Sequence, residues 1–297
     1  MSFVVAIFII IAMMCFLLIT AIKAWKYQRY PIHSRLELYP VPKEGNQRAH
    51  YGGSYFEEPR WWDKPRAIDG ANEVKDILIE MLFIRKLFKN QKSLWWASYI
   101  FHLGIYVMFA WTLLLLFATI FPFSWLVTLT SAVGLLGFLL APIGTILILV
   151  RRIFDATLRS HTTPLEYFNI ILILFVLVTG LLSWFDVASP FDVARDLLPF
   201  GGSFAYGCQA LAPIVAVHLV ALGIMLIYIP LSKMSHYVGK FFAFHKVLWD
   251  NDPNQQGSQV NERIKKASSQ PQQVTWSAPH IKTDGDKTDV EATEERS

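Results

Sequence analysis

Four long stretches without Asp, Glu, Lys or Arg constrain the fold of this chain more than any other feature. They cover residues 1–22, 93–150, 167–185 and 197–232. A helix that crosses a membrane needs about 20 apolar residues, and the stretch 93–150 is long enough for two. With 54% hydrophobic and 17% charged residues, the chain also departs from soluble domains, which carry about 25% charged residues. The sequence therefore predicts five membrane-spanning helices.

The expected fold is an all-α integral membrane five-helix bundle. The turn Phe121-Pro122-Phe123-Ser124 divides the longest stretch into two helices. Thr163-Pro164-Leu165-Glu166 is a capping box with proline at the first helical position, and it marks the start of the fourth helix. The helices are expected near 2–24, 95–120, 124–150, 165–186 and 209–235.

The distribution of positive charge predicts the orientation of the bundle. With the N-terminus outside, the inside segments 23–93, 151–162 and 233–297 carry 14, 3 and 9 Lys and Arg residues, and the outside segments carry only Arg195. Positive residues accumulate on the cytoplasmic side of membrane proteins. We therefore expect an uncleaved first helix, a cytoplasmic C-terminus and a multi-pass protein of a prokaryotic cell membrane.

Four parts of the chain follow from this topology. Residues 1–24 form an anchor helix, 25–93 a cytoplasmic partner-binding insertion, 94–245 a four-helix transmembrane core and 246–297 a cytoplasmic polar tail. Within the insertion, 71–92 has apolar residues at helical spacing and predicts a helix at the membrane surface. The polar composition from Asn251 to Ser297 predicts a disordered tail.

The cysteines and the net charge exclude several kinds of site. Cys15 and Cys208 are the only cysteines, and neither belongs to a CxxC or CxxCH motif, which disfavours iron–sulfur clusters, covalent c-type haem and zinc ribbons. The net charge is +4, without a basic stripe that would track nucleic acid. Any redox cofactor must therefore be held by other residues.

Three histidines are the candidate functional residues. His102 and His218 lie inside long apolar stretches, where ionisable residues are functional candidates by default, and His236 lies at the cytoplasmic end of the fifth helix. The alternative is that such a histidine only makes an interhelical hydrogen bond. The other histidines lie in loops, beyond the last span or in the tail, and their side chains are expected to be solvated or locally bonded: His33, His50, His161, His245 and His280.

The spacing of these histidines suits haem. His218 and His236 are 18 residues apart, which on one helix is about five turns, or about 27 Å along a shared face. Haem b needs neutral imidazoles as axial ligands and an apolar slot between helices. His102, early in the second helix, is the expected partner of His236, although depth in the membrane alone does not choose between His236 and His218. Pro230 is expected to bend the helix between the two.

Two segments resemble a known family. The family is that of the gamma subunit of respiratory nitrate reductase, a five-helix di-haem cytochrome b. Its haem-ligating second helix resembles residues 98–105 (SYIFHLGI) of this chain. Its haem-ligating fifth helix resembles residues 218–223 (HLVALG), together with 229–233 (IPLSK) and His236. The resemblance implies a cytoplasmic-side haem b on His102 and His236. It also implies an outer haem on His218 and a residue ten positions after His102. This chain has Thr112 there, so the outer haem is either absent or held by His218 alone.

The insertion carries a second, narrower resemblance. Its elements YPVP (39–42) and GGSYFEE (52–58) are similar to membrane cytochromes of the Dsr and Tmc complexes of sulfur metabolism. That resemblance implies a cytochrome b subunit of a respiratory oxidoreductase, with a cytoplasmic heterodisulfide-reductase-like iron–sulfur partner and further redox subunits. Electrons would pass between this partner, docked on 25–93 and the start of the tail, and membrane quinone, for which menaquinone is expected.

The quinone is expected near the outer edge around His218. Trp184, Asp186, Asp192 and Arg195 supply amphipathic and polar groups there, and the same residues also suit an interfacial belt. Two other classes of function remain open. A haem-free scaffold would use the histidines as interhelical hydrogen bonds, and a proton or solute transporter would use them as a relay.

Overall fold

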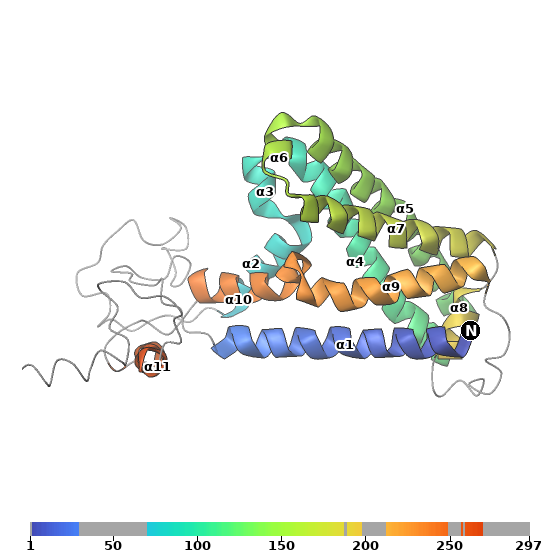
Figure 1. Cartoon of the computed structure of the whole chain (residues 1–297), viewed down its shortest axis with the longest axis horizontal. Coiled ribbons are helices and arrows are strands. Elements are labelled where there is room, and N and C mark those ends of the chain that lie inside the picture. The colour runs from blue at the N-terminus through green and yellow to red at the C-terminus, as the bar shows by residue number, and fades with distance from the viewer. Residues whose placement is uncertain are drawn as a thin grey trace, which may run out of the picture. The chain divides into compact units, whose positions relative to one another are not determined.

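The computed structural model describes residues 2–29, 70–186, 189–197, 212–248, 257 and 259–269. The chain divides into two compact units, Met1–Gln28 with Gly70–Ala243, and Arg29–Asp69 with Phe244–Ser297. All regular elements within the described residues are helices (Figure 1). The first unit contains every long helix and is the part that carries the candidate site.

Five helices are long and apolar enough to cross a membrane, which confirms the all-α, five-span prediction. They are α1 (Ser2–Arg29), α4 (Lys92–Ile120), α5 (Ser124–Phe154), α7 (Pro164–Asp186) and α9 (Pro213–Leu231). The capping box before α7 forms as expected, because the Thr163 N–H donates to the Glu166 carboxylate at 2.8 Å. Residues 209–211, which were expected to begin the fifth helix, lie outside the described residues.

The fifth helix does not run on to residue 235, so the prediction of one helix carrying both His218 and His236 is wrong. Helix α9 ends at Leu231, a 3₁₀ turn covers Lys233–Ser235, and α10 (His236–Leu248) begins at His236 itself. Pro230 supplies no N–H to the helical ladder, and the Ser232 hydroxyl accepts a hydrogen bond from the Met234 N–H at 3.1 Å. Proline and serine together end the helix instead of bending it.

The predicted surface helix over 71–92 is two helices, α2 (Gly70–Phe83) and α3 (Arg85–Asn90). Ile84 between them has a left-handed backbone with φ 48°. Side chains replace helical hydrogen bonds at this break, since the Lys86 N–H donates to the Glu80 carboxylate at 3.1 Å and the Phe83 carbonyl accepts from the Trp95 indole at 2.8 Å. The chain therefore turns sharply just before α4.

Three short helices lie where loops or disorder were expected. They are α6 (Ala156–Ser160), α8 (Pro190–Leu197) and α11 (Gln259–Ser268). The last corrects the prediction of a wholly disordered tail. Its charges suit a helix, with Glu262 in the first turn and Lys265 and Lys266 in the last, because acidic residues stabilise the N-terminus of a helix and basic residues its C-terminus.

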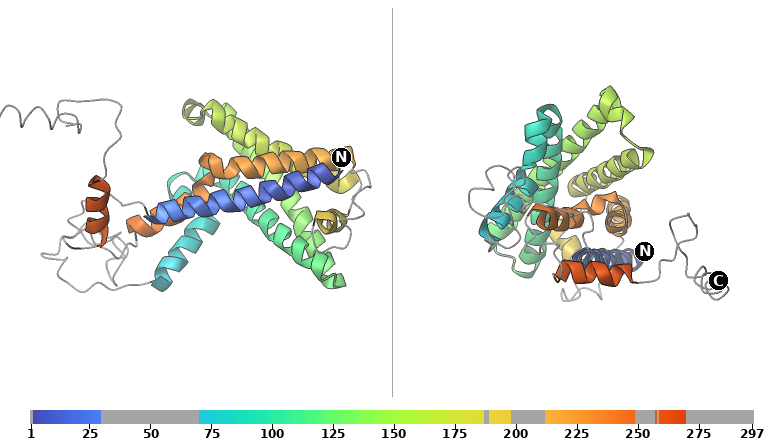
Figure 2. Two further views of the ribbon diagram at one scale, coloured as in Figure 1. Left: turned by 60° about the horizontal axis from the view of Figure 1, so that its bottom comes forward. Right: turned by 90° about the vertical axis from the view of Figure 1, so that its left-hand side faces the viewer.

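Small residues let the long helices of the first unit pack closely. A Cβ atom at Gly104 of α4 would lie 2.4 Å from the Ala141 nitrogen of α5, and one at Gly144 of α5 would lie 2.3 Å from the Phe101 nitrogen. Helix α5 also packs on α7, and α7 on α9, whereas α4 and α9 are not in close contact along their length. Figures 1 and 2 show α1, α9 and α10 on one side of this unit and α4 with α5 on the other.

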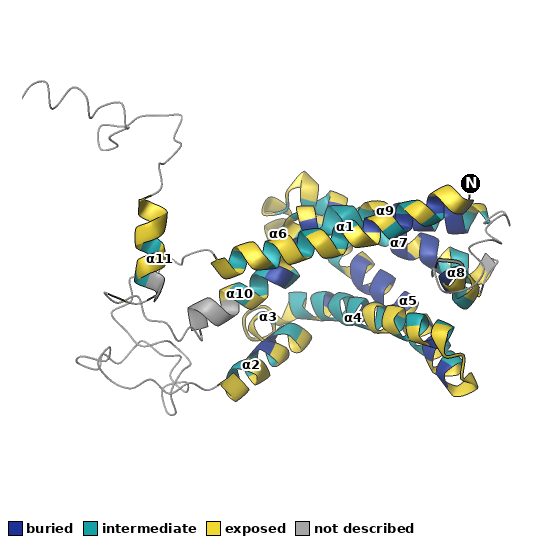
Figure 3. Cartoon of the chain, turned by 90° about the horizontal axis from the view of Figure 1, so that it is seen from below, coloured by how far each residue is buried: buried dark blue, intermediate teal, exposed yellow. Residues whose placement is uncertain are grey.

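Exposed residues run along the outer surfaces of the long helices, as Figure 3 shows, and many of them are large and apolar. Phe109 of α4 is 66% exposed and Phe185 of α7 is 72% exposed. Apolar side chains in such numbers on the outside suit a hydrocarbon solvent and not water. We call the end of the bundle at which α1, α5 and α9 finish the basic end, since Lys23, Arg151 and Lys233 lie there.

Candidate functional site

His102 lies in the third turn of α4, near the basic end. Its Nδ1 lies 2.6 Å from the backbone carbonyl of Ser98, one turn earlier, and 3.3 Å from the Ser98 hydroxyl. A carbonyl can only accept, so Nδ1 carries the proton and donates. The other ring nitrogen, Nε2, is left unprotonated on the neutral ring and is free to bind a metal, the arrangement that metal-ligating histidines adopt in proteins.

His236, the first residue of α10, faces His102. The centroids of the two rings are 6.3 Å apart, with an angle of 76° between the ring planes. A metal–imidazole bond is about 2 Å long and the ligating nitrogen lies about 1 Å from its ring centroid, so two imidazoles on opposite sides of one metal have centroids about 6 Å apart. The observed separation is therefore compatible with both imidazoles binding one metal ion.

The surroundings favour a neutral imidazole at His236. The His236 side chain is exposed in part; partial burial of the ring lowers its pKa below the usual value, and hydrogen bonding to the backbone of Lys233 partly opposes that shift. A neutral imidazole is the form that binds iron. Two protein ligands are enough for haem, because the porphyrin fills the other positions on the metal. His102 and His236 lie on helices that are not in close contact, and as a pair of imidazoles they fit haem.

An ion pair between a buried glutamate and a partly exposed lysine lies beside the two histidines. Glu80 of α2 is 7% exposed, and its carboxylate accepts from Lys240 of α10 at 3.3 Å. Lys240 is close enough to lower the pKa of His236 further. Sequence reasoning missed both residues. The available signal was Glu80 itself, an acidic residue three positions after Ile77 on the buried face of α2.

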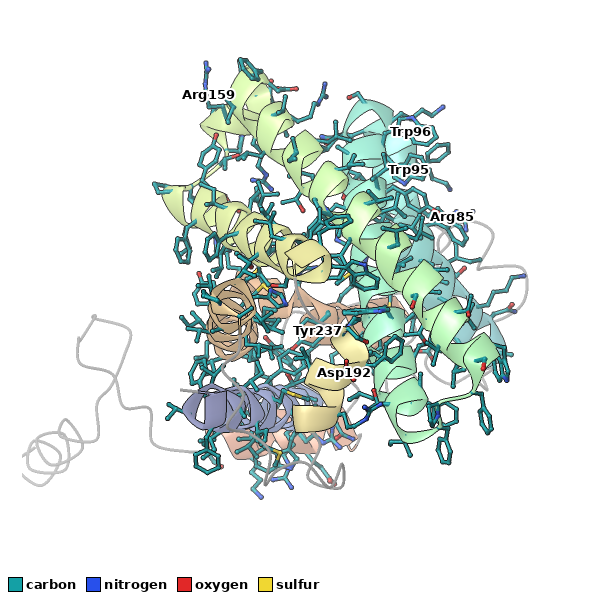
Figure 4. All side chains as sticks on the ribbon, turned by 90° about the vertical axis from the view of Figure 1, so that its right-hand side faces the viewer. Arg85, Trp95, Trp96, Arg159, Asp192 and Tyr237 are labelled. Atoms are coloured by element: carbon teal, nitrogen blue, oxygen red, sulfur yellow. The ribbon has the colours of Figure 1, made fainter. Side chains whose placement is uncertain are left out.

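Aromatic residues fix α2 and α3 against the start of α4. The Tyr106 hydroxyl donates to the Met81 carbonyl at 2.7 Å, and the Trp95 ring stacks on Tyr99 with centroids 4.7 Å apart. Figure 4 shows Arg85, Trp95 and Trp96 projecting at this end of α4. The insertion helices are therefore built into the wall around His102.

His218 is not paired with either of the other candidates. Its Nδ1 lies 3.3 Å from the Thr179 hydroxyl of α7, and its ring hydrogen-bonds to the backbone of Val176. A Cβ atom at Gly180 would lie 2.9 Å from the His218 ring. The structure thus gives His218 the contacts of a residue that joins α9 to α7.

Aromatic side chains fill the space next to His218. Trp111 of α4, Phe138 of α5 and Trp184 of α7 form a cluster, with ring centroids 5.3 to 5.8 Å apart. A Cβ atom at Gly180 would lie 2.7 Å from Phe138, so Phe138 and His218 meet at the same glycine. The Trp111 indole nitrogen is buried without a hydrogen-bond partner among the described residues.

The remaining predicted residues are dispersed. Thr112 is exposed and donates to the Met108 carbonyl of its own helix at 2.9 Å. Asp192 and Arg195 of α8 pair with each other at 3.2 Å on the surface, and the Asp186 side chain lies outside the described set. His161 is exposed and bonds to Thr157 at 2.8 Å. The side chains of the other four loop and tail histidines fall outside the described residues: His33, His50, His245 and His280.

No group of three or more His, Cys, Asp and Glu side chains that could hold a metal ion occurs in the described ranges. Comparisons with known proteins give a limited similarity. No protein-family model matches the sequence. Over 102 residues the chain is 29% identical to the Hdr-like menaquinol oxidoreductase cytochrome b-like subunit of Archaeoglobus fulgidus, a match that covers 33% of this chain and 31% of the relative. The chain thus resembles, over about a third of each sequence, a cytochrome b-like subunit of a menaquinol oxidoreductase.

Proposed function

We propose that this protein is the membrane cytochrome b subunit of a multi-subunit oxidoreductase, with one haem b held between His102 and His236. The observation that carries the proposal is the 6.3 Å separation of the two imidazole centroids, on helices α4 and α10. Bound there, haem supplies a one-electron carrier inside the apolar layer. The limited similarity to a menaquinol oxidoreductase subunit supports the same class of function.

The residues of this chain orient the two ligands, of which His102 is half-buried and His236 is exposed. The Ser98 carbonyl holds the proton of His102 at Nδ1, so that Nε2 stays available. Phe101 and Tyr106 of α4 lie next to the His102 ring, with ring centroids 5.1 and 6.4 Å from it, and the groups around a redox centre help to set its potential. Lys240 and Glu80 place a cation and an anion next to the pair.

A single haem is favoured over two. The resemblance to a di-haem cytochrome would require a ligand at Thr112, whose hydroxyl instead donates to its own helix. The cluster of Trp111, Phe138 and Trp184 occupies the bundle beside His218. A macrocycle at His218 would have to displace these three large side chains, which supports a count of one.

Electrons are proposed to pass between menaquinone and a cytoplasmic heterodisulfide-reductase-like iron–sulfur partner. The name of the relative supports both the quinone and the type of complex. The partner is proposed to dock at the basic end, which lies closest to the His102–His236 pair and carries α2 and α3. The outer-edge quinone site, the cell membrane location and a role in sulfur metabolism are proposed with it.

The test is reduction of the protein by a menaquinol analogue. Membranes that contain the full-length protein are mixed with the reduced analogue, and the b-type absorbance is followed. We expect reduction in the wild-type protein and in His161→Ala, whose exposed ring serves as a matched control. We expect no b-type signal in His102→Ala or His236→Ala. A correctly folded wild-type protein without haem would support the scaffold instead, and solute uptake by the isolated chain would support the transporter.

A further inference from the structure

The direction of the His236 side chain is not set by the long helix that precedes it. Three residues of 3₁₀ turn separate α9 from His236, so the rigidity of α9 ends before the ligand. Inside the turn, the Ser235 hydroxyl donates to the Ser232 carbonyl at 2.8 Å. A short turn of this kind is a poorer support than an α-helix, and an axial ligand needs its geometry held within about 0.5 Å.

Helix α1 contacts both chain neighbours of His236. The Lys23 ammonium donates to the Ser235 hydroxyl at 2.8 Å, and the Thr20 and Tyr237 hydroxyls are hydrogen-bonded at 2.7 Å. Thr20 and Lys23 lie one turn apart on α1, and Ser235 and Tyr237 lie directly before and after His236. Two side chains on one face of α1 therefore hydrogen-bond to the side chains of the residues on both sides of the proposed ligand.

The hydrogen bonds at Ser235 form one connected chain. Ser235 is 7% exposed, and its hydroxyl accepts from Lys23 while it donates to the Ser232 carbonyl. A hydroxyl can do both at once. Lys23 thus acts on the turn through a buried group, and not merely as a lysine that reaches out of the apolar layer.

Aromatic contacts extend the same interface along α10. Phe16 of α1 stacks on Tyr237 with ring centroids 6.2 Å apart, and Tyr27 of α1 meets Phe242 of α10 at 6.1 Å. Tyr237 is labelled in Figure 4. Helix α1 therefore contacts α10 from Tyr237 to Phe242, although the two helices are more than 200 residues apart in the sequence.

We propose that α1 is a brace for the haem ligand, with Thr20 and Lys23 as positioning residues that hold His236 toward His102. The inference rests on the proposed function, because it takes His236 to be an axial ligand. It goes beyond a membrane anchor, since an anchor needs only an apolar surface, and it gives the first helix a part in the redox site.

The experiment measures how much haem iron loses its sixth ligand. Carbon monoxide binds a reduced haem only where one axial position is free, so the fraction that forms the adduct reports detachment of a histidine. In the full-length protein we expect almost no adduct for the wild type. In the Thr20→Val/Lys23→Met double variant we expect the adduct fraction to rise by at least about tenfold, because the variant removes two hydrogen bonds and the loss of one already produces about that factor.

Matched control variants and a double-mutant cycle separate the loss of these hydrogen bonds from other effects of the substitutions. Lys23→Arg keeps a donor and should behave as the wild type, and Lys26→Met removes an exposed lysine one turn away and should do the same. Lys23→Met and Ser235→Ala remove the same hydrogen bond, so their effects should not add. This cycle uses single, milder changes and remains informative if the double variant fails to fold.

Two results separate the brace from the proposed function. A double variant with full haem content and wild-type carbon monoxide reactivity would overturn the brace while leaving the ligand assignment intact. A six-coordinate haem that persists in His236→Ala would overturn the ligand assignment itself, and the brace with it.

Discussion

Replacement of Gly104 by alanine tests whether the close approach of α4 and α5 holds the candidate site together. Gly104 lies two residues after His102, and a Cβ atom there would lie 2.4 Å from the Ala141 nitrogen and 2.5 Å from the Ala141 Cα. Ordinary contacts begin near 3.4 Å. Because both clashing atoms are backbone, no side chain can rotate away, and the helices must separate by about 1 Å.

The expected cost follows from this displacement. Overfilling a packed interface costs about 1–3 kcal/mol, which corresponds to a fall in melting temperature of roughly 3–10 °C for a chain of this size. A displacement of about 1 Å also exceeds the tolerance of about 0.5 Å for a ligating side chain. We therefore expect Gly104→Ala to lower both the melting temperature and the haem content, measured on detergent-purified protein by thermal unfolding and by pyridine haemochrome absorbance.

Gly239→Ala is the matched control for this change. A Cβ atom there would lie 3.9 Å from the Tyr27 ring, which is ordinary contact, and alanine is better than glycine in a helix by about 1 kcal/mol. The control should be as stable as the wild type or more stable. Equal melting temperatures and haem contents for Gly104→Ala and wild type would refute the close packing of α4 on α5.

Three further predictions concern residues around the site. Lys240→Met should destabilise the protein by about 2 kcal/mol, because it leaves the nearly buried Glu80 carboxylate without its cation. Glu80→Gln should destabilise it less, because the glutamine still accepts a hydrogen bond from the Lys86 N–H. Equal melting temperatures for the two variants would contradict this prediction. Ile84→Gly should stabilise the protein by about 1 kcal/mol, since a β-branched residue is strained at φ 48°, and a lower melting temperature would refute that strain. Thr112→His should leave the haem content at one per chain, because the cluster of Trp111, Phe138 and Trp184 fills the space; a second haem in the pyridine haemochrome measurement would show that the space is available.

The helices that face lipid could be predicted from the sequence alone. Stretches without charge identify membrane-spanning segments because a buried charge in hydrocarbon is costly, and the turn at Pro122 and the capping box at Thr163 both lie at helix boundaries. Such signals are local, so they can be read without knowing the tertiary structure.

The end of α9 before His236 could not be predicted from a local signal in the same way. Pro230 is compatible with a bend or with a helix end, and the choice depends on Ser232 capping the next turn. The spacing argument over 18 residues failed for this reason, although the pairing of His102 with His236 was expected from the resemblance. The pair remains a proposed ligand set.

The groups that support the pair depend on contacts between distant parts of the chain. Glu80 and Lys240 are 160 residues apart, and Lys23 and Ser235 are 212 residues apart. No local sequence pattern predicts such partners, because a lysine at the end of a membrane helix is first interpreted as an interfacial anchor. Their roles became visible only from the fold of α1, α2 and α10 around the histidines.

Electron paramagnetic resonance of the oxidised, purified full-length protein tests the central claim most directly. We predict one low-spin ferric haem signal per chain with two imidazole ligands. This signal should be lost in His102→Ala and in His236→Ala and kept in His218→Ala. A signal that survives removal of either His102 or His236, or a folded wild-type protein that contains no haem, would contradict the account.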